Sequence, residues 1–267
     1  MNACNRPVTS REYKLMLNVE RFKNREEGSR AFSHLIKFLI EKEGGKIIEE
    51  QDKKETRQTS YLDTTELALR QHGFTLRLRE EADGCQVTLK YRSPDRYLAA
   101  AQDVSSPLAD ETKFEEDILP PFVSKFSHST SVRKVSPADL TDMQQITKLF
   151  PSLEKLELGN AVIKPVGNFK AAEVVRKLCK FQFNDTSTIK ACLSFWYLTK
   201  EEDDWPLVAE FSFDYDAPDK ELAGDTMEMY PNRMVEGANG LFSALQSQSG
   251  WVNFNATTKT AFAFEVF

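Results

Sequence analysis

The sequence predicts an α+β fold that is mainly antiparallel, and three observations support this prediction. Many segments alternate apolar and polar residues with a period of two, as half-buried β-strands do, and together they predict about eight strands or more. Two other segments repeat apolar residues at helical spacing. Short clusters of Gly, Pro, Asn and Asp separate these segments and indicate turns. The chain has 267 residues, enough for one large domain or two small ones.

The first predicted elements are a strand and an amphipathic helix. Residues 1–9 resemble a flexible lead. Ser10–Val19 alternates strictly, with apolar side chains on one face and with Glu12 and Lys14 on the other. Gly28–Glu43 carries apolar residues at helical spacing, and two glycines end the pattern. We therefore expect this helix to pack on the sheet.

The next predicted elements lead to a hairpin with one cationic face. Lys46–Glu49 and Gln58–Asp63 are expected strands, and Asp63 can cap a short helix that runs through Gln71. Thr75–Glu80 and Val87–Arg92 then alternate on either side of an Asp-Gly turn. The cations of the two strands share one face: Arg77, Arg79, Lys90 and Arg92.

This cationic face allows two interpretations. Four fixed cations in a row suit a ligand with several negative charges, such as a polyphosphate. Alternatively, the face points only at water, because antiparallel sheets commonly keep one side solvated. The hairpin alone does not decide between them.

The middle of the chain changes in character. Residues 93–110 carry loop signals, and Lys113–Leu119 is a short alternating strand. Residues 120–160 open with two prolines and contain a predicted helix from Ser136, its N-cap, to Phe150. We interpret this stretch as a helical insertion in a single domain that spans residues 10–267, and as a possible surface for a protein partner.

The β pattern returns after the insertion. The expected strands are Asn160–Lys164, Val174–Phe183, Thr188–Leu198 and Leu207–Tyr215. Gly237–Gly250 predicts a helix, and the apolar tail Thr260–Phe267 predicts a last strand. Several of these strands carry charges along one whole face. An open sheet would show them to solvent, whereas a closed barrel would point them into a polar lumen, and alternation does not choose between these arrangements.

Composition limits the function classes. The net charge of −6 argues against general nucleic-acid binding, which favours basic domains. Four widely spaced cysteines predict free thiols in a reducing compartment. No secretory signal and no stretch of about 18 apolar residues is visible, so we expect a cytoplasmic protein, although a substrate of a specialised export system would look the same.

The predicted strand faces combine charges of both signs in a way that suits phosphoryl chemistry. Cations can hold phosphate oxygens, and carboxylates can hold Mg²⁺. On Glu210–Asp214 two acids share one face, but they lie roughly 13 Å apart, so facing strands would have to complete a metal site. The charged residues on these faces are Glu12, Lys14, Arg77, Arg79, Lys90, Lys113, Glu115, Asp117, Arg176, Glu210 and Asp214.

In the order and spacing of its motifs the chain resembles the CYTH, or triphosphate tunnel metalloenzyme, family. Ser10–Lys14 stands where the family has Glu-x-Glu-x-Lys, and Leu76–Arg79 stands where it has Leu-Arg-x-Arg. The other similar segments are Tyr61–Thr64, Leu67–Gly73, Thr88–Lys90, Lys113–Glu115, Val175–Lys177, Glu210–Asp214 and Thr258–Lys259. Residues 58–90 are the specific part of this resemblance.

The resemblance implies an eight-stranded antiparallel β-barrel that forms a tunnel, with outer helices. It implies binding and hydrolysis of inorganic triphosphate, thiamine triphosphate or a nucleoside triphosphate with Mg²⁺ or Mn²⁺; an adenylate cyclase has less support, because no nucleobase pocket is recognisable. By position, the implied substrate ligands are Lys14, Arg77, Arg79, Lys90, Lys113, Arg176 and Lys259. The implied metal ligands are Glu12, Glu115, Glu210 and Asp214, and the implied catalytic residues are Glu12, Lys14 and Glu210.

The chain also departs from the family pattern. Ser10, Ser194 and Ser212 stand where family members carry acids, and Lys190 occupies another such position. Each missing carboxylate weakens a metal site. The cations are better kept than the acids, which favours retained binding over retained catalysis. Two alternatives therefore remain open: a non-catalytic polyphosphate or nucleotide binder, and an interaction protein that uses residues 120–160.

Overall fold

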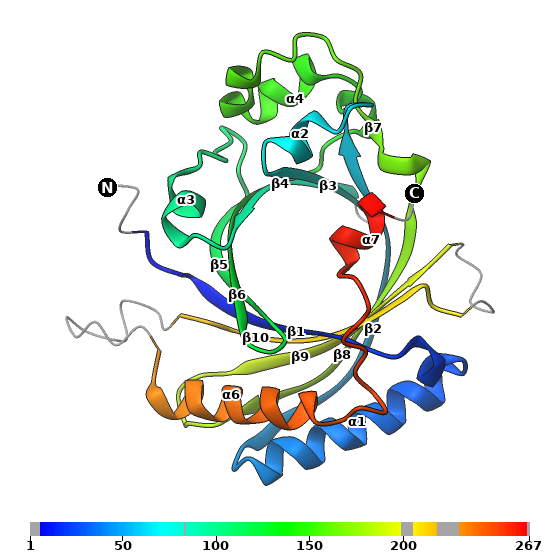
Figure 1. Cartoon of the computed structure of the whole chain (residues 1–267), viewed down its shortest axis with the longest axis vertical. Helices are drawn as coiled ribbons and strands as arrows, with labels where there is room; N and C mark the ends of the chain where they lie inside the picture. Colours follow the sequence, from blue (N-terminus) through cyan, green and yellow to red (C-terminus); the bar gives the residue numbers. More distant parts are fainter. Residues whose placement is uncertain (1–5, 83, 199–204, 218–229, 266–267) are drawn as a thin grey trace.

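Nine β-strands of the described chain form a closed ring (Figure 1). The computed structural model describes residues 6–82, 84–198, 205–217 and 230–265. The hydrogen-bonded order is β3-β4-β6-β5-β1-β10-β9-β8-β2, and β2 pairs with β3 to close the ring. The ring strands are β1 (Ser10–Met16), β2 (Lys46–Asp63), β3 (Phe74–Glu81), β4 (Gly84–Ser93), β5 (Glu111–Leu119), β6 (Val123–Arg133), β8 (Ala171–Gln182), β9 (Ile189–Tyr197) and β10 (Val208–Asp216). A two-residue strand, β7 (Lys164–Pro165), adds to β2 outside the ring.

The ring decides between the open sheet and the closed arrangement, and it differs from the expected eight antiparallel strands. It has nine strands within the described residues, and β1 runs parallel to β5 while its other neighbour β10 is antiparallel. The predicted strands Lys46–Glu49 and Gln58–Asp63 are parts of one long strand, β2. The additional strand is β6, which lies inside the segment that was predicted to be a helical insertion.

The main apolar core lies outside the ring, between its strands and two helices. These helices are α1 (Arg25–Lys42) and α6 (Asn232–Gln246), which lie along the outer face of the sheet (Figure 1). On β10 the buried aromatic side chains of Phe211, Phe213 and Tyr215 belong to this core. Because successive side chains of a strand point to opposite faces, the residues between them point into the ring. The ring is therefore apolar outside and polar inside.

The helical insertion covers the outer face of the cationic hairpin. It follows β6 and comprises short helices around α4 (Met143–Leu149), so it begins after Arg133 and not at residue 120. The sequence signal misled because β6 is rich in Ser and Thr and follows two prolines. Ser136 caps a 3₁₀ turn at Pro137–Asp139, and the α-helix starts only after Asp142. Ile146 and Phe150 pack with the apolar side chains of β3 and β4 in a second core.

The remaining elements border the ring. They are α2 (Ala68–Gln71), α3 (Arg96–Ala101) and the C-terminal α7 (Lys259–Glu265). The tail predicted as a strand is thus helical up to Glu265, and its last two residues lie outside the described chain. The predicted strand Asn160–Lys164 contributes only a bridge at Val162 and the start of β7.

The N-terminal residues and the bounds of the two long helices differ slightly from the prediction. Of the predicted lead 1–9, residues 1–5 are not described, while Val8 is buried beside Phe114. α1 begins at Arg25 with Asn24 as its N-cap, and α6 lies a few residues earlier than expected. A search of the described helices finds no segment with the length and hydropathy of a membrane span.

Candidate functional site

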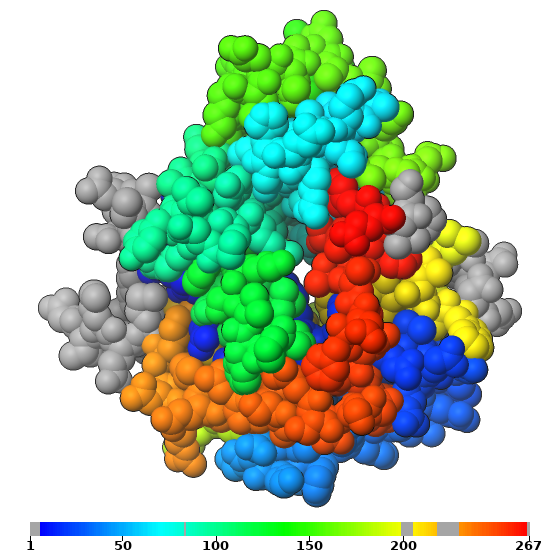
Figure 2. All heavy atoms as spheres, in the orientation of Figure 1, coloured from blue at the N-terminus to red at the C-terminus, as the bar shows by residue number. Residues whose placement is uncertain are grey.

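The ring encloses a cavity of about 480 Å³ that is lined by charges of both signs. Figure 2 shows a narrow hollow at the centre of this face, beside the C-terminal segment in red. Nine cations line the cavity: Lys14, Arg70, Arg77, Arg79, Lys90, Arg92, Lys113, Lys125 and Lys259. Six carboxylates line it: Glu12, Glu111, Glu115, Asp117, Glu173 and Glu210. The lining thus carries a formal charge of +3 in a chain whose net charge is −6.

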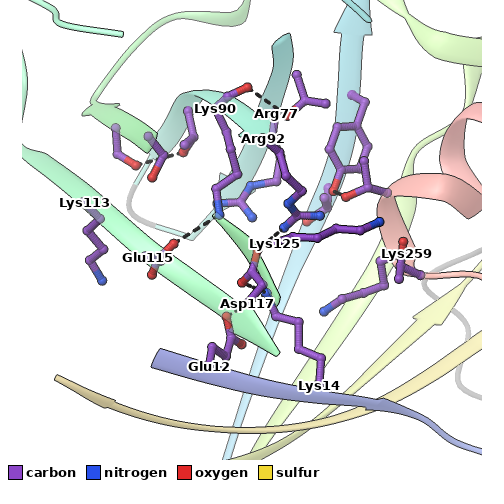
Figure 3. Close-up of a pocket in the computed structure, with 18 of the residues that line it drawn as sticks. Glu12, Lys14, Arg77, Lys90, Arg92, Lys113, Glu115, Asp117, Lys125 and Lys259 are labelled. Atoms are coloured by element: carbon purple, nitrogen blue, oxygen red, sulfur yellow. Dashed lines mark hydrogen bonds and ion pairs between the residues drawn. The ribbon is translucent and has the colours of Figure 1, made fainter. Parts of the chain in front are cut away.

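The β3–β4 hairpin supplies one wall of the cavity. In its register Arg77 lies opposite Thr88, and Thr75 lies opposite Lys90. Side chains two residues apart share a face, so the arginines of β3 and Lys90 and Arg92 of β4 all point inward. Figure 3 shows Arg77, Lys90 and Arg92 directed toward the acidic strand β5 across the cavity. The outer face of the same strands is apolar, which fixes this orientation.

Asp117 organises the cations at one side of the cavity (Figure 3). Its side chain is 1% exposed and accepts hydrogen bonds from Lys14 Nζ at 2.7 Å and from Arg92 Nη2 at 2.6 Å. Lys14 also pairs with Glu12 at 2.8 Å. Burial alone would raise the pKa of Asp117, but Arg92, Lys14 and Lys90 hold it well below its usual range. Next to this group, Lys90 pairs with Glu115 at 3.1 Å.

Glu173 organises the opposite side of the cavity. This side chain on β8 is also 1% exposed, and Arg57 Nε donates to it at 2.6 Å. Lys259 lies 3.2 Å from Glu173 and 2.8 Å from Glu210. Burial would raise the pKa of Glu173, but Lys259, Arg79 and Arg57 hold it well below its ordinary value. Both carboxylates are therefore ionised at neutral pH and tied to cations.

Arg77 and Arg79 differ from these tightly paired cations because much of their hydrogen-bonding capacity is unused. The Nε atoms of both are buried and have no hydrogen-bond partner, and no ion pair of Arg77 is found among the described residues. Arg79 approaches Glu173 only to 3.9 Å. Burial and the neighbouring Arg77 lower the pKa of Arg79 to about 9. Two adjacent guanidinium groups held in this way have hydrogen-bonding capacity left for an anion.

Most of the predicted site residues line the cavity, and two do not. Those that line it are Glu12, Lys14, Arg77, Arg79, Lys90, Lys113, Glu115, Glu210 and Lys259. Arg176 does not: it points to the outer side of β8 and pairs with Glu26 of α1 and Asp52 of β2, both at 2.6 Å. It lies three residues after the inward Glu173, and an odd spacing on a strand reverses the face.

Asp214 lies near one end of the ring without lining the cavity. It is the register partner of Glu12 across the β1–β10 pair. Burial and the charge of Glu12 raise the pKa of Asp214 to about 7. Of the four predicted metal ligands, these two are the only pair that the strand register places opposite each other within the described residues.

The four predicted metal ligands do not fit a divalent metal centre. Glu115 pairs with Lys90, and Glu210 pairs with Lys259, so each carboxylate already has a cation. Across the described ranges, no group of three or more His, Cys, Asp or Glu side chains could hold a metal ion. A hard cation such as Mg²⁺ needs several oxygen ligands around one point. The arrangement therefore supports anion binding more directly than metal binding.

Sequence reasoning missed several residues of the site. Arg92 and Asp117 were visible as inward charges of predicted strands but were not chosen as site residues. Glu173 was missed because the strand was predicted to start at Val174; extending the alternation by one residue would have revealed it. Arg70 and Lys125 were missed because Arg70 lies in the short helix α2 and Lys125 lies in β6, a strand inside the segment that was predicted to be a helical insertion.

Comparisons with known proteins give only a distant likeness in structure. No family profile matches the sequence, and no curated protein matches it. A candidate adenylyl cyclase from Hippeastrum, HpAC1, described with a dominant triphosphatase activity, is 12% identical over 96% of this chain and 95% of its own, with a TM-score of 0.46. A candidate adenylate cyclase from Bacillus halodurans is 13% identical over 96% and 97%, with a TM-score of 0.41. PH1819 from Pyrococcus horikoshii is 13% identical over 97% and 99%, with a TM-score of 0.38.

Proposed function

We propose that the cavity binds the triphosphate group of a small molecule and that the chain is a diverged CYTH protein. The observation that carries this proposal is the pair Arg77 and Arg79, whose buried Nε atoms lack partners inside a cavity with a formal charge of +3. Planar guanidinium groups hold phosphate oxygens through paired hydrogen bonds. Inorganic triphosphate, thiamine triphosphate and nucleoside triphosphates all carry the required charge.

The other cations extend the phosphate site in both directions. Lys90 and Arg92 continue the wall of Arg77 on β4, and Lys125 of β6 and Arg70 of α2 also line the cavity. Lys125 has no ion pair within the described chain, so its positive charge is not neutralised by a neighbouring carboxylate. A cationic lining inside an acidic protein draws anions to the cavity specifically.

Calorimetry tests this function. We expect sodium tripolyphosphate to bind the wild-type protein in buffer with EDTA, because the cavity supplies cations without a metal. The Arg77→Ala variant should bind markedly more weakly. The proposal fails if tripolyphosphate does not bind the folded protein, or if its affinity is the same after Arg77→Ala.

Hydrolysis of the bound triphosphate is the second candidate, and the pair Glu12 and Asp214 favours it. A carboxylate that lines the cavity can accept a proton from the attacking water, and Glu12 lines it beside its register partner Asp214, whose pKa is raised to about 7 by burial and by the charge of Glu12. Phosphate release from tripolyphosphate, thiamine triphosphate and ATP, measured with Mg²⁺, with Mn²⁺ and with EDTA, tests it. If no substrate is turned over under any condition while tripolyphosphate binds, the protein is a binder and not a hydrolase.

A further inference from the structure

Glu173 holds its place in the cavity through a complete set of hydrogen bonds. Oε2 accepts from Arg57 Nε at 2.6 Å and from Thr59 Oγ1 at 2.9 Å. Oε1 accepts from Ser194 Oγ at 2.9 Å and from Lys259 Nζ at 3.2 Å. Two cations and two hydroxyl groups around one anion are the donors that would also hold a phosphoryl group. The Glu173 carboxylate thus occupies a set of donors that could otherwise bind an anionic ligand.

The fold fixes this carboxylate inside the ring. Glu173 is the register partner of Arg57 on β2 and of Trp196 on β9, so it sits between two paired strands. The neighbouring Val174 belongs to the outer core, which forces Glu173 inward. Its position therefore follows from the strand alternation, and a change of rotamer cannot carry it out of the cavity.

The cations around Glu173 are the continuation of the proposed phosphate site. Arg79 lies 3.9 Å from Glu173 and follows Arg77 on the same inward face of β3. An anion that binds Arg77 and extends toward Arg79 therefore approaches Glu173 directly. Like charges repel strongly in such a buried setting. The ligand and Glu173 compete for the same guanidinium and ammonium groups.

We propose that Glu173 is an internal counter-anion that competes with the ligand for the cavity-lining cations Arg79 and Lys259, and that it limits how many phosphoryl groups the cavity accepts. This inference rests on the proposed function, because it concerns the same cavity. It assigns Glu173 a role in specificity: a short phosphate chain bound at Arg77 stays clear of Glu173, whereas a longer chain that extends to Arg79 meets the negative charge of Glu173.

The test replaces Glu173 with its neutral isostere and measures two ligands. In calorimetry with EDTA present, Glu173→Gln should bind tripolyphosphate at least about tenfold more tightly than the wild type, a factor that corresponds to 1.4 kcal/mol. Pyrophosphate, which is shorter, should gain less than about threefold. Glu49→Gln is the matched control, since Glu49 is exposed, pairs with Lys180 and does not line the cavity. It removes the same charge and should leave both affinities unchanged.

A second variant covers the case in which Glu173→Gln does not fold. Glu173→Asp keeps the charge but withdraws the carboxylate by one methylene, so it cannot reach all four donors. We expect the same preference for tripolyphosphate, with a smaller gain. If either folded variant binds tripolyphosphate no better than the wild type, Glu173 only links β2, β8 and α7 structurally and the inference is overturned.

The outcomes separate this inference from the proposed function. If wild-type protein binds tripolyphosphate in an Arg77-dependent way and the Glu173 variants gain nothing, only the role of Glu173 is refuted. If the wild type does not bind but Glu173→Gln does, the native function is refuted while the competition is supported. If none of the proteins binds, both proposals fall.

Discussion

Two arginines of the ring, Arg77 and Arg176, show how the same residue type serves opposite environments on the two faces of one sheet. Arg77 of β3 points into the cavity, and its buried Nε has no hydrogen-bond partner among the residues that the structure describes. Arg176 of β8 points outward and is held by Glu26 and Asp52 at 2.6 Å each. The outer arginine is satisfied by the protein itself, whereas the inner one has donors to spare. Unused hydrogen-bonding capacity, and not positive charge alone, therefore distinguishes the candidate site.

Removing the two guanidinium groups inside the cavity is the strongest test of this comparison. The double variant Arg77→Ala/Arg79→Ala should lose about 3–6 kcal/mol of tripolyphosphate binding, because hydrogen bonds to charged groups contribute about 1.5–3 kcal/mol each. That loss is at least about 100-fold in affinity by calorimetry. Since the two residues have few partners in the free protein, the variant should fold with an unchanged thermal midpoint or a higher one. An affinity within a factor of about three of the wild type would contradict the assignment of the site.

Asp117 tests the other half of the comparison, because this charge inside the cavity does have partners in the protein. Asp117→Asn leaves Lys14 and Arg92 without their buried carboxylate. Breaking a buried pair on one side costs about 3–5 kcal/mol, and because Lys14 and Arg92 are partly exposed, we expect about 2–3 kcal/mol from urea unfolding at pH 7. Glu116→Gln is a control on the same strand, where Arg11 loses a less buried partner. Equal stabilities of Asp117→Asn and wild type would count against the ion-pair network.

The pH dependence of the same variant has a definite sign. The pKa of Asp117 is lower in the folded protein than its value of about 3.9 in an unfolded chain. Its contribution to stability is therefore complete above about pH 4 and is lost as the pH falls below that value. The wild type should lose more stability than Asp117→Asn when urea midpoints are compared between pH 5 and pH 3.

The titration of Asp214 should change the free energy of unfolding with pH in the opposite direction. Its pKa of about 7 is higher than in the unfolded chain, so the folded protein binds a proton that unfolding releases between about pH 4 and pH 7. Stability through this group falls as the pH rises across that window and is level above pH 8. The difference in pKa sets an upper bound of about 2–3 kcal/mol on the change in stability between pH 5 and pH 8, and this change should disappear in Asp214→Asn. Glu12→Gln should lower the pKa of Asp214 and shift the window to lower pH, because it removes the neighbouring charge.

Alternation of apolar and polar residues along a strand predicts which face each side chain takes, but it does not predict which residues of other strands lie opposite. It placed Arg77, Arg79 and Lys90 on one face, because a strand covered by an apolar core has only one polar side. The family resemblance, and not alternation, placed Arg176 inside: alternation gives it the same face as Val174 and Leu178 of the outer core. The partners of these charges could not be predicted, since Glu173 meets Lys259 across 86 residues. A pattern along one strand holds no information on which distant strand faces it.

The same limit explains the errors in the fold. The closed ring depends on the pairing of β2 with β3 and on the parallel contact between β1 and β5. Neither contact is local, and parallel neighbours need no special sequence in the strands themselves. β6 was hidden because its cavity-lining side chains are Lys125, Ser129 and Ser131, so a single charge and two serines replace the charged face that marked the other strands. The C-terminal helix was mistaken for a strand because an apolar run of this length fits either structure.

Among these variants, the substitution of Arg176 should have the smallest effect on ligand affinity. Arg176→Ala should leave tripolyphosphate affinity within a factor of about two, because the residue lies outside the cavity. Its partners Glu26 and Asp52 are more than half exposed, and exposed ion pairs contribute about 0–1 kcal/mol each, so the loss in unfolding free energy for the two pairs should be at most about 2 kcal/mol. Salt at 1 M should abolish even this difference between variant and wild type, since screening acts on exposed charges first. A loss of binding comparable to that of the Arg77 variants would show that the outer face of β8 takes part in ligand recognition, and the distinction between satisfied and unsatisfied arginines would no longer identify the site.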